Sequence, residues 1–197
     1  MTGIILAGGE NRRMGTDKAL LDINGRPLIE HILSVFAGLF EHTIIVTNTP
    51  DRYRSYGVGM TGDVLDIRGP LTGIYSGLLR SGDEYNFVAA CDMPYLNPRL
   101  IAYMGQQAAG RDAVVPMFDG FLEPLHAIYR RSILSTIETQ IRRQDRRIRG
   151  IFDHIQVRYI TDDEIVRFDP LKRSFKNLNT PKEYKEAVCS DSECRNC

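Results

Sequence analysis

Residues 3–21 read GIILAGGENRRMGTDKALL, a short apolar run that leads directly into a glycine-rich, basic loop. The run at residues 3–7 predicts a buried strand. Glycines in the loop allow backbone N–H groups to approach oxygen atoms closely, and Arg13 and Lys18 add positive charge. A strand that feeds such a loop is typical of phosphate-binding sites in α/β proteins.

Two better-known phosphate-binding loops do not match this segment. The G-x-x-x-x-G-K-[ST] pattern is excluded because Gly15 is followed by Thr16 rather than by a lysine, and the G-x-G-x-x-G pattern because Gly8 and Gly9 are adjacent. An ordinary glycine-rich turn with solvated basic side chains is the alternative, and for a bare Gly-Gly pair it would be preferred. The full string L-A-G-G-x-x-x-R-M-G-x-D-K argues against that alternative.

Farther along the chain, short apolar runs alternate with helical patterns, which is typical of βαβ units around a mainly parallel sheet. The predicted fold class is therefore α/β. Strands are predicted at residues 3–7, 43–47, 86–91, 113–116 and 156–160, and helices at residues 27–40, 69–79, 94–109, 128–143 and 180–188.

The charge balance argues for a local binding site. Lys plus Arg number 25 and Asp plus Glu number 25 in a chain of 197 residues, so no global field favours a nucleic acid or a membrane as partner. The N-terminus lacks a basic stretch before its apolar run, and that run is too short to span a membrane. We expect a cytoplasmic protein with one domain at residues 1–188.

The cysteines and the basic cluster are weaker signals. Cys189, Cys194 and Cys197 lie in a polar tail at residues 189–197, which we expect to be disordered, and a metal or redox role for them is the less favoured reading. The run RRQDRRIR at residues 142–149 favours a solvated face, although a contact with a substrate phosphate is an alternative. His126, in an apolar segment, is read as a satisfied structural histidine rather than a general base.

Asp92 comes directly after the apolar strand predicted at residues 86–91. Ligands bind at the carboxyl ends of strands in open α/β sheets, so this carboxylate stands at the expected place. Magnesium needs only one or two protein carboxylates, because phosphates and water supply its other oxygen ligands. An aspartate at a strand-to-turn junction also occurs without any function, while Cys91 beside it is read as a packing residue.

The N-terminal string resembles the signature of nucleotidyltransferases of the molybdenum cofactor guanylyltransferase family. Further segments resemble family motifs in the same order, so that the resemblance covers roughly residues 3–188: KALLDINGRPL (18–28), GPLTGI (69–74), ACDMP (90–94) and NLNTP (177–181). It implies a three-layer, Rossmann-like nucleotidyltransferase fold and transfer of GMP from GTP to molybdenum-molybdopterin with Mg²⁺ as cofactor. Transient contacts with other cofactor-biosynthesis proteins and with target molybdoenzymes follow from the same resemblance.

The resemblance also implies a set of site residues. Arg13, Lys18 and Asp92 would be catalytic, and Asp92 and Asn179 would hold the metal. GTP would contact Leu6, Ala7, Gly8, Gly9, Arg13, Lys18, Asn48, Asp63, Gly69, Pro70, Leu71, Gly73 and Asp92.

Some assignments remain open at this level. The base contact after the second strand falls on Thr47 by spacing and on Asn48 by residue type, and Asp66 competes with Asp63. Gly73 and Gly77 share a helix face, where they allow close approach of either a neighbouring element or a ligand. Asn177 and Asn179 would face the same side of an extended segment and approach one metal or phosphate, unless they form a turn that caps the next helix.

Three other functions compete with guanylyl transfer. A cytidylyltransferase acting on the same pterin is disfavoured by the Gly8-Gly9 pair, because those relatives resemble L-A-A-G at this loop. A sugar-phosphate nucleotidyltransferase shares the fold but usually has a longer chain. A nucleotide-binding regulator without activity is disfavoured because Arg13, Lys18 and Asp92 are all present.

Overall fold

The computed structural model describes residues 1–8, 18–178 and 183 of the chain. Apart from residue 183, the helix predicted at residues 180–188 lies outside this description, as does the cysteine tail at 189–197. The described strands are β1 (Thr2–Leu6), β2 (Asp22–Ile23), β3 (Arg26–Pro27), β4 (His42–Val46), β5 (Gly59–Thr61), β6 (Tyr85–Ala90), β7 (Ala113–Phe118), β8 (Phe121–Leu122), β9 (His126–Arg130) and β10 (Val157–Ile160).

Eight of these strands form one sheet in the order β10-β7-β9-β6-β1-β4-β5, with β8 paired to β7 beside this path. The central pairs β6–β1, β1–β4 and β4–β5 are parallel, as is β7–β10, whereas β9 runs antiparallel between β6 and β7. The predicted α/β class with a mainly parallel central sheet is confirmed.

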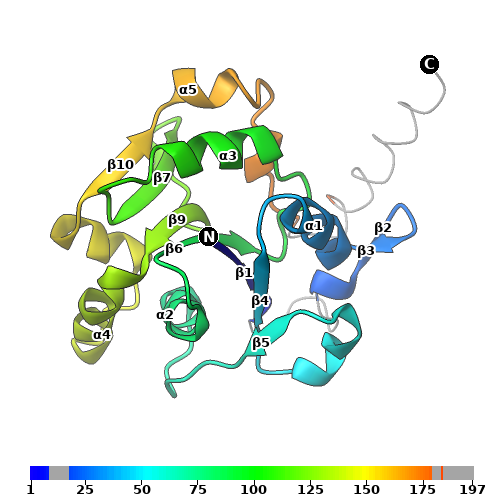
Figure 1. Ribbon diagram of the computed structural model, residues 1–197, viewed down its shortest axis with the longest axis horizontal. Coiled ribbons are helices and arrows are strands. Elements are labelled where there is room, and N and C mark those ends of the chain that lie inside the picture. Colours follow the sequence, from blue (N-terminus) through cyan, green and yellow to red (C-terminus); the bar gives the residue numbers. More distant parts are fainter. Residues whose placement is uncertain (9–17, 179–182, 184–197) are drawn as a thin grey trace.

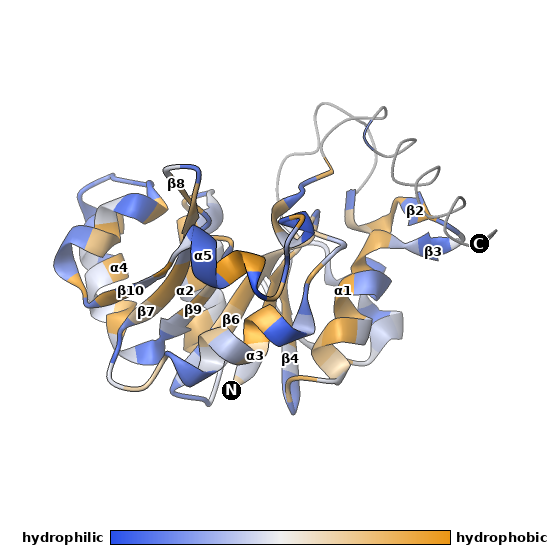
Figure 2. Ribbon diagram, turned by 90° about the horizontal axis from the view of Figure 1, so that it is seen from above, coloured by the Kyte–Doolittle hydropathy of each residue, from blue (hydrophilic) through white to orange (hydrophobic). Residues whose placement is uncertain are grey.

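Helices cover both faces of the sheet and give three layers (Figure 1). The helices are α1 (Leu28–Ala37), α2 (Pro70–Arg80), α3 (Pro98–Gln106), α4 (Leu134–Arg142) and α5 (Asp162–Val166), and short 3-10 turns include η1 (Lys18–Leu20), η5 (Ile148–His154) and η6 (Arg173–Phe175). Apolar residues concentrate on the strands and on the inward faces of the helices (Figure 2).

The core divides into two clusters because successive strand side chains point to opposite faces. In β1, Ile5 packs with α1, α3 and α5, whereas Ile4 and Leu6 pack with α2 and α4. The buried strand predicted at residues 3–7 is therefore the middle of the three-layer structure.

The predicted helix at residues 128–143 is wrong in its first part. Residues His126–Arg130 form β9, and the α-helix begins only at Leu134. Sheet neighbours and helices bury β9 almost completely, so its sequence lacks the alternation that marks a half-exposed strand. The helix predicted from residue 94 begins instead at Pro98, because the side chain of Asn97 accepts hydrogen bonds from the N–H groups of Arg99 and Leu100.

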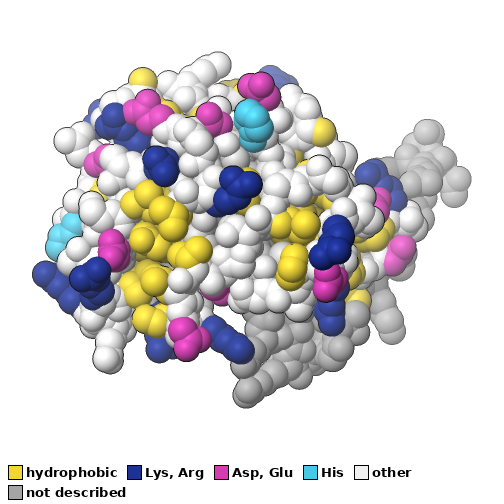
Figure 3. Space-filling view, turned by 60° about the horizontal axis from the view of Figure 1, so that its bottom comes forward, with side chains coloured by type: hydrophobic (Ala, Val, Ile, Leu, Met, Phe, Trp, Pro, Cys, Tyr) yellow, Lys and Arg dark blue, Asp and Glu magenta, His cyan; other side chains and the backbone are white. Residues whose placement is uncertain are grey.

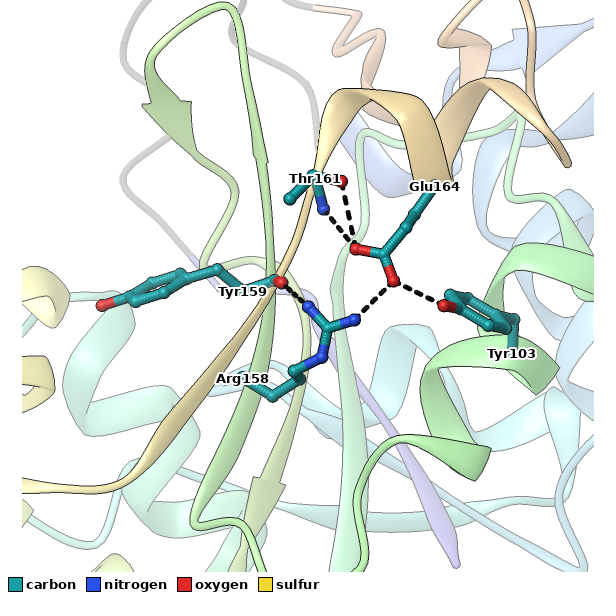
Figure 4. A network of polar contacts seen from close by, with 5 residues as sticks. All are labelled: Tyr103, Arg158, Tyr159, Thr161 and Glu164. Carbon is teal, nitrogen blue, oxygen red and sulfur yellow. Dashed lines mark hydrogen bonds and ion pairs between the residues drawn. The ribbon is translucent and has the colours of Figure 1, made fainter.

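A network of hydrogen bonds and one ion pair connects the edge strand β10 with helices α3 and α5 (Figure 4). Glu164 in α5 accepts hydrogen bonds from Thr161 N–H at 2.9 Å and from the Tyr103 hydroxyl at 2.5 Å, and it pairs with Arg158 of β10. Burial alone would raise the pKa of Glu164, but the hydrogen bonds from Thr161, Tyr103 and Arg158 outweigh burial and lower this pKa to about 2. The carboxylate therefore stays ionised at physiological pH and holds α3, α5 and β10 together.

His126 is buried as expected, but it is not satisfied. Its exposed fraction is 0%, its ring lies edge-on to Phe87 and Phe175 at 5.0 Å each, and neither ring nitrogen has a hydrogen-bond partner among the described residues. Burial lowers the pKa of His126 from 6.5 to about 3, although the charge of Asp169 opposes this shift. The histidine is neutral in the folded protein and costs stability.

We expect His126→Leu to stabilise the protein, and more so at acidic pH. The unfolded chain takes up a proton below pH 6.5 while the folded one does so only near 3, so stability falls as pH drops through this window. At about pH 5 this linkage amounts to about 2 kcal/mol, which the variant would not lose. Urea unfolding of the wild type and of His126→Leu at about pH 7.5 and pH 5 measures the free energy of unfolding. If both proteins lost the same free energy between the two pH values, the prediction would be contradicted.

Candidate active site

The carboxyl ends of four parallel strands meet at one edge of the sheet. Leu6 is in register with Val46 and Ala90, and Val46 is in register with Thr61. The residues that follow these strands therefore lie beside one another: Ala7 and Gly8 after β1, Thr47 and Asn48 after β4, Gly62 and Asp63 after β5, and Cys91 and Asp92 after β6. This edge is the ligand-binding edge of an open α/β sheet.

Lys18 and Asp92 face each other at this edge. The Nζ atom of Lys18, at the start of η1, lies 3.9 Å from Oδ2 of Asp92, and the two side chains are only 23% and 20% exposed. Burial raises the pKa of Asp92, and the positive charge of Lys18 partly offsets this rise. A shielded lysine–carboxylate pair in this position is suited to binding a phosphate together with a cation.

The segment that carries Asn177 lies against Asp92. The N–H of Leu178 donates to the carbonyl oxygen of Asp92 at 3.0 Å, and Leu178 itself is buried. Oδ1 of Asn177 is buried and has no hydrogen-bond partner among the described residues. An unpartnered amide oxygen on a segment that is hydrogen-bonded to the backbone of Asp92 is of the kind that Mg²⁺ prefers as a ligand.

In the part of the chain that the structure describes, no group of three or more His, Cys, Asp or Glu side chains is arranged to hold a metal ion. Cys91 is partly buried and packs against the core, as predicted.

Asn48 and Asp63 form a reciprocal pair across the ends of β4 and β5. Nδ2 of Asn48 donates to Oδ2 of Asp63 at 2.9 Å, and the Asp63 N–H donates to Oδ1 of Asn48 at 2.9 Å. Thr47, by contrast, is 2% exposed, and its hydroxyl oxygen accepts a hydrogen bond from the Thr49 N–H. Of the competing residues, Asn48 and Asp63 are the two that the fold brings together.

The N-terminus of α2 points toward the same edge. Gly73 lies against Leu6 at the end of β1, and Gly77, one turn later, lies against Ile4, so the helix runs opposite to the strand. A Cβ atom at Gly77 would come within 2.7 Å of Ile4, which identifies this glycine as a packing residue. Gly69, with a φ of 152°, and Pro70 begin the helix, whose N-terminal dipole favours an anion there.

A cavity of about 450 Å³ borders the start of α2. It is lined by Pro70, Pro124, Asp153, Gly150, Ile148 and three arginines: Arg146, Arg147 and Arg149. On the face shown in Figure 3, acidic and basic side chains are interspersed.

A family model described as the MobA-like NTP transferase domain matches residues 3–159. The chain belongs to the MobA-like NTP transferase family. A relative named molybdenum cofactor guanylyltransferase, from Desulfosudis oleivorans, is 36% identical over 95% of this chain and 94% of its own. A second, from Natranaerobius thermophilus and named probable molybdenum cofactor guanylyltransferase, is 34% identical over 95% of this chain and 94% of its own.

Solved structures show the same fold. The molybdopterin-guanine dinucleotide biosynthesis protein A from Archaeoglobus fulgidus superimposes with a TM-score of 0.85 at 29% identity, over 98% of this chain and 100% of that one. A cytidylyltransferase from Thermus thermophilus superimposes with a TM-score of 0.70 but is only 15% identical, so it shares the fold alone.

Most of the residues implied by the resemblance to this MobA-like family gather at the carboxyl edge. Leu6 ends β1, Ala7 and Gly8 follow it, and Asn48, Asp63 and Asp92 come after the ends of β4, β5 and β6. Lys18 reaches this edge through its pairing with Asp92. Gly69, Pro70, Leu71 and Gly73 belong to the start of α2. Gly9, Arg13 and Asn179 lie outside the described residues. The arginines of the basic run at residues 142–149 are exposed, as a solvated face predicts, and Arg146, Arg147 and Arg149 also line the cavity at Pro70.

Proposed function

We propose that this protein transfers GMP from GTP to the phosphate of molybdenum-molybdopterin, forming molybdopterin guanine dinucleotide and releasing pyrophosphate. The observation that carries the proposal is the pairing of Lys18 with Asp92 at 3.9 Å, beside the Asn48–Asp63 pair on the same sheet edge. One pair has the chemistry to handle phosphates, and the other has the donors and acceptors to bind a base. The names of the relatives agree with GTP and molybdopterin as substrates.

The reaction needs no nucleophile from the protein. A terminal phosphate oxygen of the acceptor attacks the α-phosphorus of GTP, and the bond from this phosphorus to the bridging oxygen of the β-phosphate breaks. Because the attacking oxygen is already anionic, no general base has to remove a proton. Lys18 and the N-terminal end of α2 would bind and orient the phosphates, which is how most phosphoryl transfers are catalysed.

Asp92 and Asn177 would hold the cofactor, which we propose to be Mg²⁺, and Asn179 is a further proposed ligand. When bound, the metal neutralises the charge that develops on the phosphates. Asp92 is shielded from solvent and has the positive charge of Lys18 beside it, while the unpartnered Oδ1 of Asn177 offers a second oxygen.

The acceptor phosphate has a natural place in the arginine-lined cavity. The cavity borders Pro70, and α2 begins at Pro70, so an anion bound there would lie close to the nucleotide phosphates. Arginine matches phosphate oxygens with several donors in a fixed plane. Arg146, Arg147 and Arg149 are accordingly proposed to bind the acceptor.

The proposal extends to where the reaction takes place and which proteins contact the enzyme. None of the helices that the structure describes has the length and apolarity needed to cross a bilayer. We place the reaction in the cytoplasm, where GTP is available, and the catalytic domain at residues 1–188. Transient contacts with other cofactor-biosynthesis proteins and with target molybdoenzymes would deliver the acceptor and receive the product.

Pyrophosphate release tests the proposal. The purified protein is incubated with molybdopterin, Mg²⁺ and each of GTP, CTP, ATP and UTP in turn. Release with GTP alone is expected, and it should require molybdopterin. Release with CTP would favour a cytidylyltransferase. Release only with a sugar phosphate as acceptor would favour a sugar-phosphate nucleotidyltransferase, and no release with any acceptor would favour a nucleotide-binding regulator without activity.

We expect Asp63→Asn to weaken selection of GTP. Guanine presents its N1–H and 2-amino donors to one side, and a carboxylate accepts both, whereas an amide accepts only one. Losing a hydrogen bond to a charged group costs roughly 1.5 to 3 kcal/mol, so KM for GTP should rise at least about tenfold, while discrimination against ATP shrinks. Steady-state kinetics with both nucleotides measures the change.

Asp66→Asn is the matched control for this prediction. Asp66 is the competing aspartate on the same loop, and its side chain is exposed. The control should leave KM for GTP unchanged. If Asp66→Asn raised KM and Asp63→Asn did not, the base contact would belong to Asp66.

A further inference from the structure

Arg147 is the arginine of the cavity whose guanidinium is held by a carboxylate. Its Nε donates to Oδ1 of Asp145 at 3.0 Å, and its Nη2 donates to Oδ2 at 2.8 Å. This two-point contact fixes the plane of the guanidinium. It leaves both protons of Nη1 and one of Nη2 available for another anion.

The backbone of Arg147 is fixed as well. Its N–H donates to Oδ1 of Asp145 at 3.0 Å, and its carbonyl oxygen accepts from Nε2 of Gln140 at 2.5 Å and from the Gly150 N–H at 3.1 Å. Gln140 is only 7% exposed and belongs to α4, so it ties this arginine to the helical layer.

The local sequence builds this arrangement around a tight turn. Gln144 adopts a left-handed conformation with a φ of 61° just after α4, and the Asp145 N–H then donates back to the Gln140 carbonyl at 3.2 Å. Gly150 packs against both side chains: a Cβ atom there would lie 2.9 Å from Oε1 of Gln140 and 3.0 Å from Oδ2 of Asp145. The turn therefore places a carboxylate, an amide and Arg147 in one compact unit.

We propose that Asp145 is a positioning residue that orients the guanidinium of Arg147 toward an anionic acceptor in the cavity. That the anion is the acceptor's phosphate rests on the proposed function; the orienting role rests on the contacts alone. The hydrogen bonds from Arg147 lower the pKa of Asp145 to about 2, so its carboxylate is ionised whenever the enzyme works.

If Asp145 acted only through its charge, its removal would have the opposite effect. Asp145 also cancels positive charge beside the cavity, so its removal should strengthen anion binding if orientation did not matter. The sign of the effect of Asp145→Asn therefore distinguishes positioning from charge balance. Positioning predicts that KM for molybdopterin rises roughly fivefold, the upper end for an exposed ion pair, while KM for GTP does not change.

Asp153→Asn is the matched control. Asp153 lines the same cavity, and its charge acts on Arg147, but no hydrogen bond joins the two side chains in the described structure. Its neutralisation removes one negative charge without releasing the arginine. KM for molybdopterin should therefore fall in this variant, opposite to the effect of Asp145→Asn.

The experiment combines these variants with Arg147→Ala in a double-mutant cycle. If Asp145 acts through Arg147, Asp145→Asn has no further effect on KM for molybdopterin in the Arg147→Ala background. A second measure does not depend on turnover: binding of inorganic phosphate is monitored through the NMR signal of the Arg147 Nε–H group. Phosphate should bind more weakly to Asp145→Asn and more tightly to Asp153→Asn.

The outcomes separate the two proposals. The positioning role would be overturned if Asp145→Asn bound phosphate and molybdopterin as tightly as the wild type or more tightly. It would also be overturned if Asp145→Asn raised KM for molybdopterin as much in the Arg147→Ala background as in the wild-type protein. A wild-type protein that transfers no GMP but binds phosphate more tightly than Asp145→Asn would contradict the proposed function and support positioning.

Discussion

Lys18→Ala is expected to lower kcat for GMP transfer roughly a hundred- to a thousandfold, with little effect on folding. Removing one preorganised charge contact to a transition state typically costs about 2.7 to 4 kcal/mol. Lys18 is suited to this role because its ammonium group lies at the carboxyl edge, 3.9 Å from Asp92. Steady-state kinetics with GTP and molybdopterin, together with thermal unfolding, measures both effects.

Two further variants make this test specific. Lys18→Arg keeps the charge and should retain more activity than Lys18→Ala. Arg80→Ala removes an exposed cation at the far end of α2 from Pro70 and should leave kcat unchanged. Near-normal turnover in Lys18→Ala would remove this lysine from the proposed site.

Lys18→Ala should also change the pH dependence of turnover. Burial raises the pKa of Asp92, and the charge of Lys18 is what opposes the rise. Without the lysine, this pKa should rise further, so the residual activity would be lost at a higher pH on the acid side than in the wild type.

Much of this site was predictable from local sequence. The strand at residues 3–7, the carboxylate after the strand at residues 86–91 and the helix that begins near Gly69 each depend on a short segment with a clear hydrophobic period or a turn residue. Parallel strands then bring their carboxyl ends to one edge, where Asp92 lies. The approach of Lys18 to Asp92 is a contact between distant segments that only the structure shows.

Other parts depend on contacts between distant segments. The choice of Asn48 and Asp63 over their neighbours follows from the parallel register of β4 and β5, because Val46 pairs with Thr61. No local pattern reveals that register. The strand β9 is hidden for a different reason: both of its faces are buried, so its apolar run has no period.

The basic run at residues 142–149 is exposed as predicted, but its composition does not reveal that three of its arginines line a cavity. Alternating arginines after a helix are typical of a solvated face. The left-handed Gln144 and the side chain of Asp145 turn the chain back, so that Arg147 lines a cavity beside Pro70. Asp145 could not be singled out from the sequence, because its role depends on a turn formed with Gln140 and Gly150.

Asp92→Asn is expected to abolish most GMP transfer and, at neutral pH, to stabilise the fold. The amide keeps the shape of the side chain and the hydrogen bond from Leu178 to the backbone of residue 92, but it removes the ionic ligand. Losing that electrostatic contribution should lower kcat roughly a hundred- to a thousandfold. Higher Mg²⁺ should restore only part of the activity, because magnesium binds neutral amides more weakly than carboxylates.

The expected gain in stability follows from the direction of the pKa shift. Burial raises the pKa of Asp92 in the folded protein, so above its unfolded pKa the ionised carboxylate costs folding energy. Asparagine avoids this cost, and its advantage should disappear at low pH, where the wild-type side chain is protonated. Thermal unfolding at neutral and acidic pH, beside Mg²⁺-dependent kinetics, measures both effects. Loss of activity together with loss of stability at neutral pH would instead identify Asp92 as a structural residue.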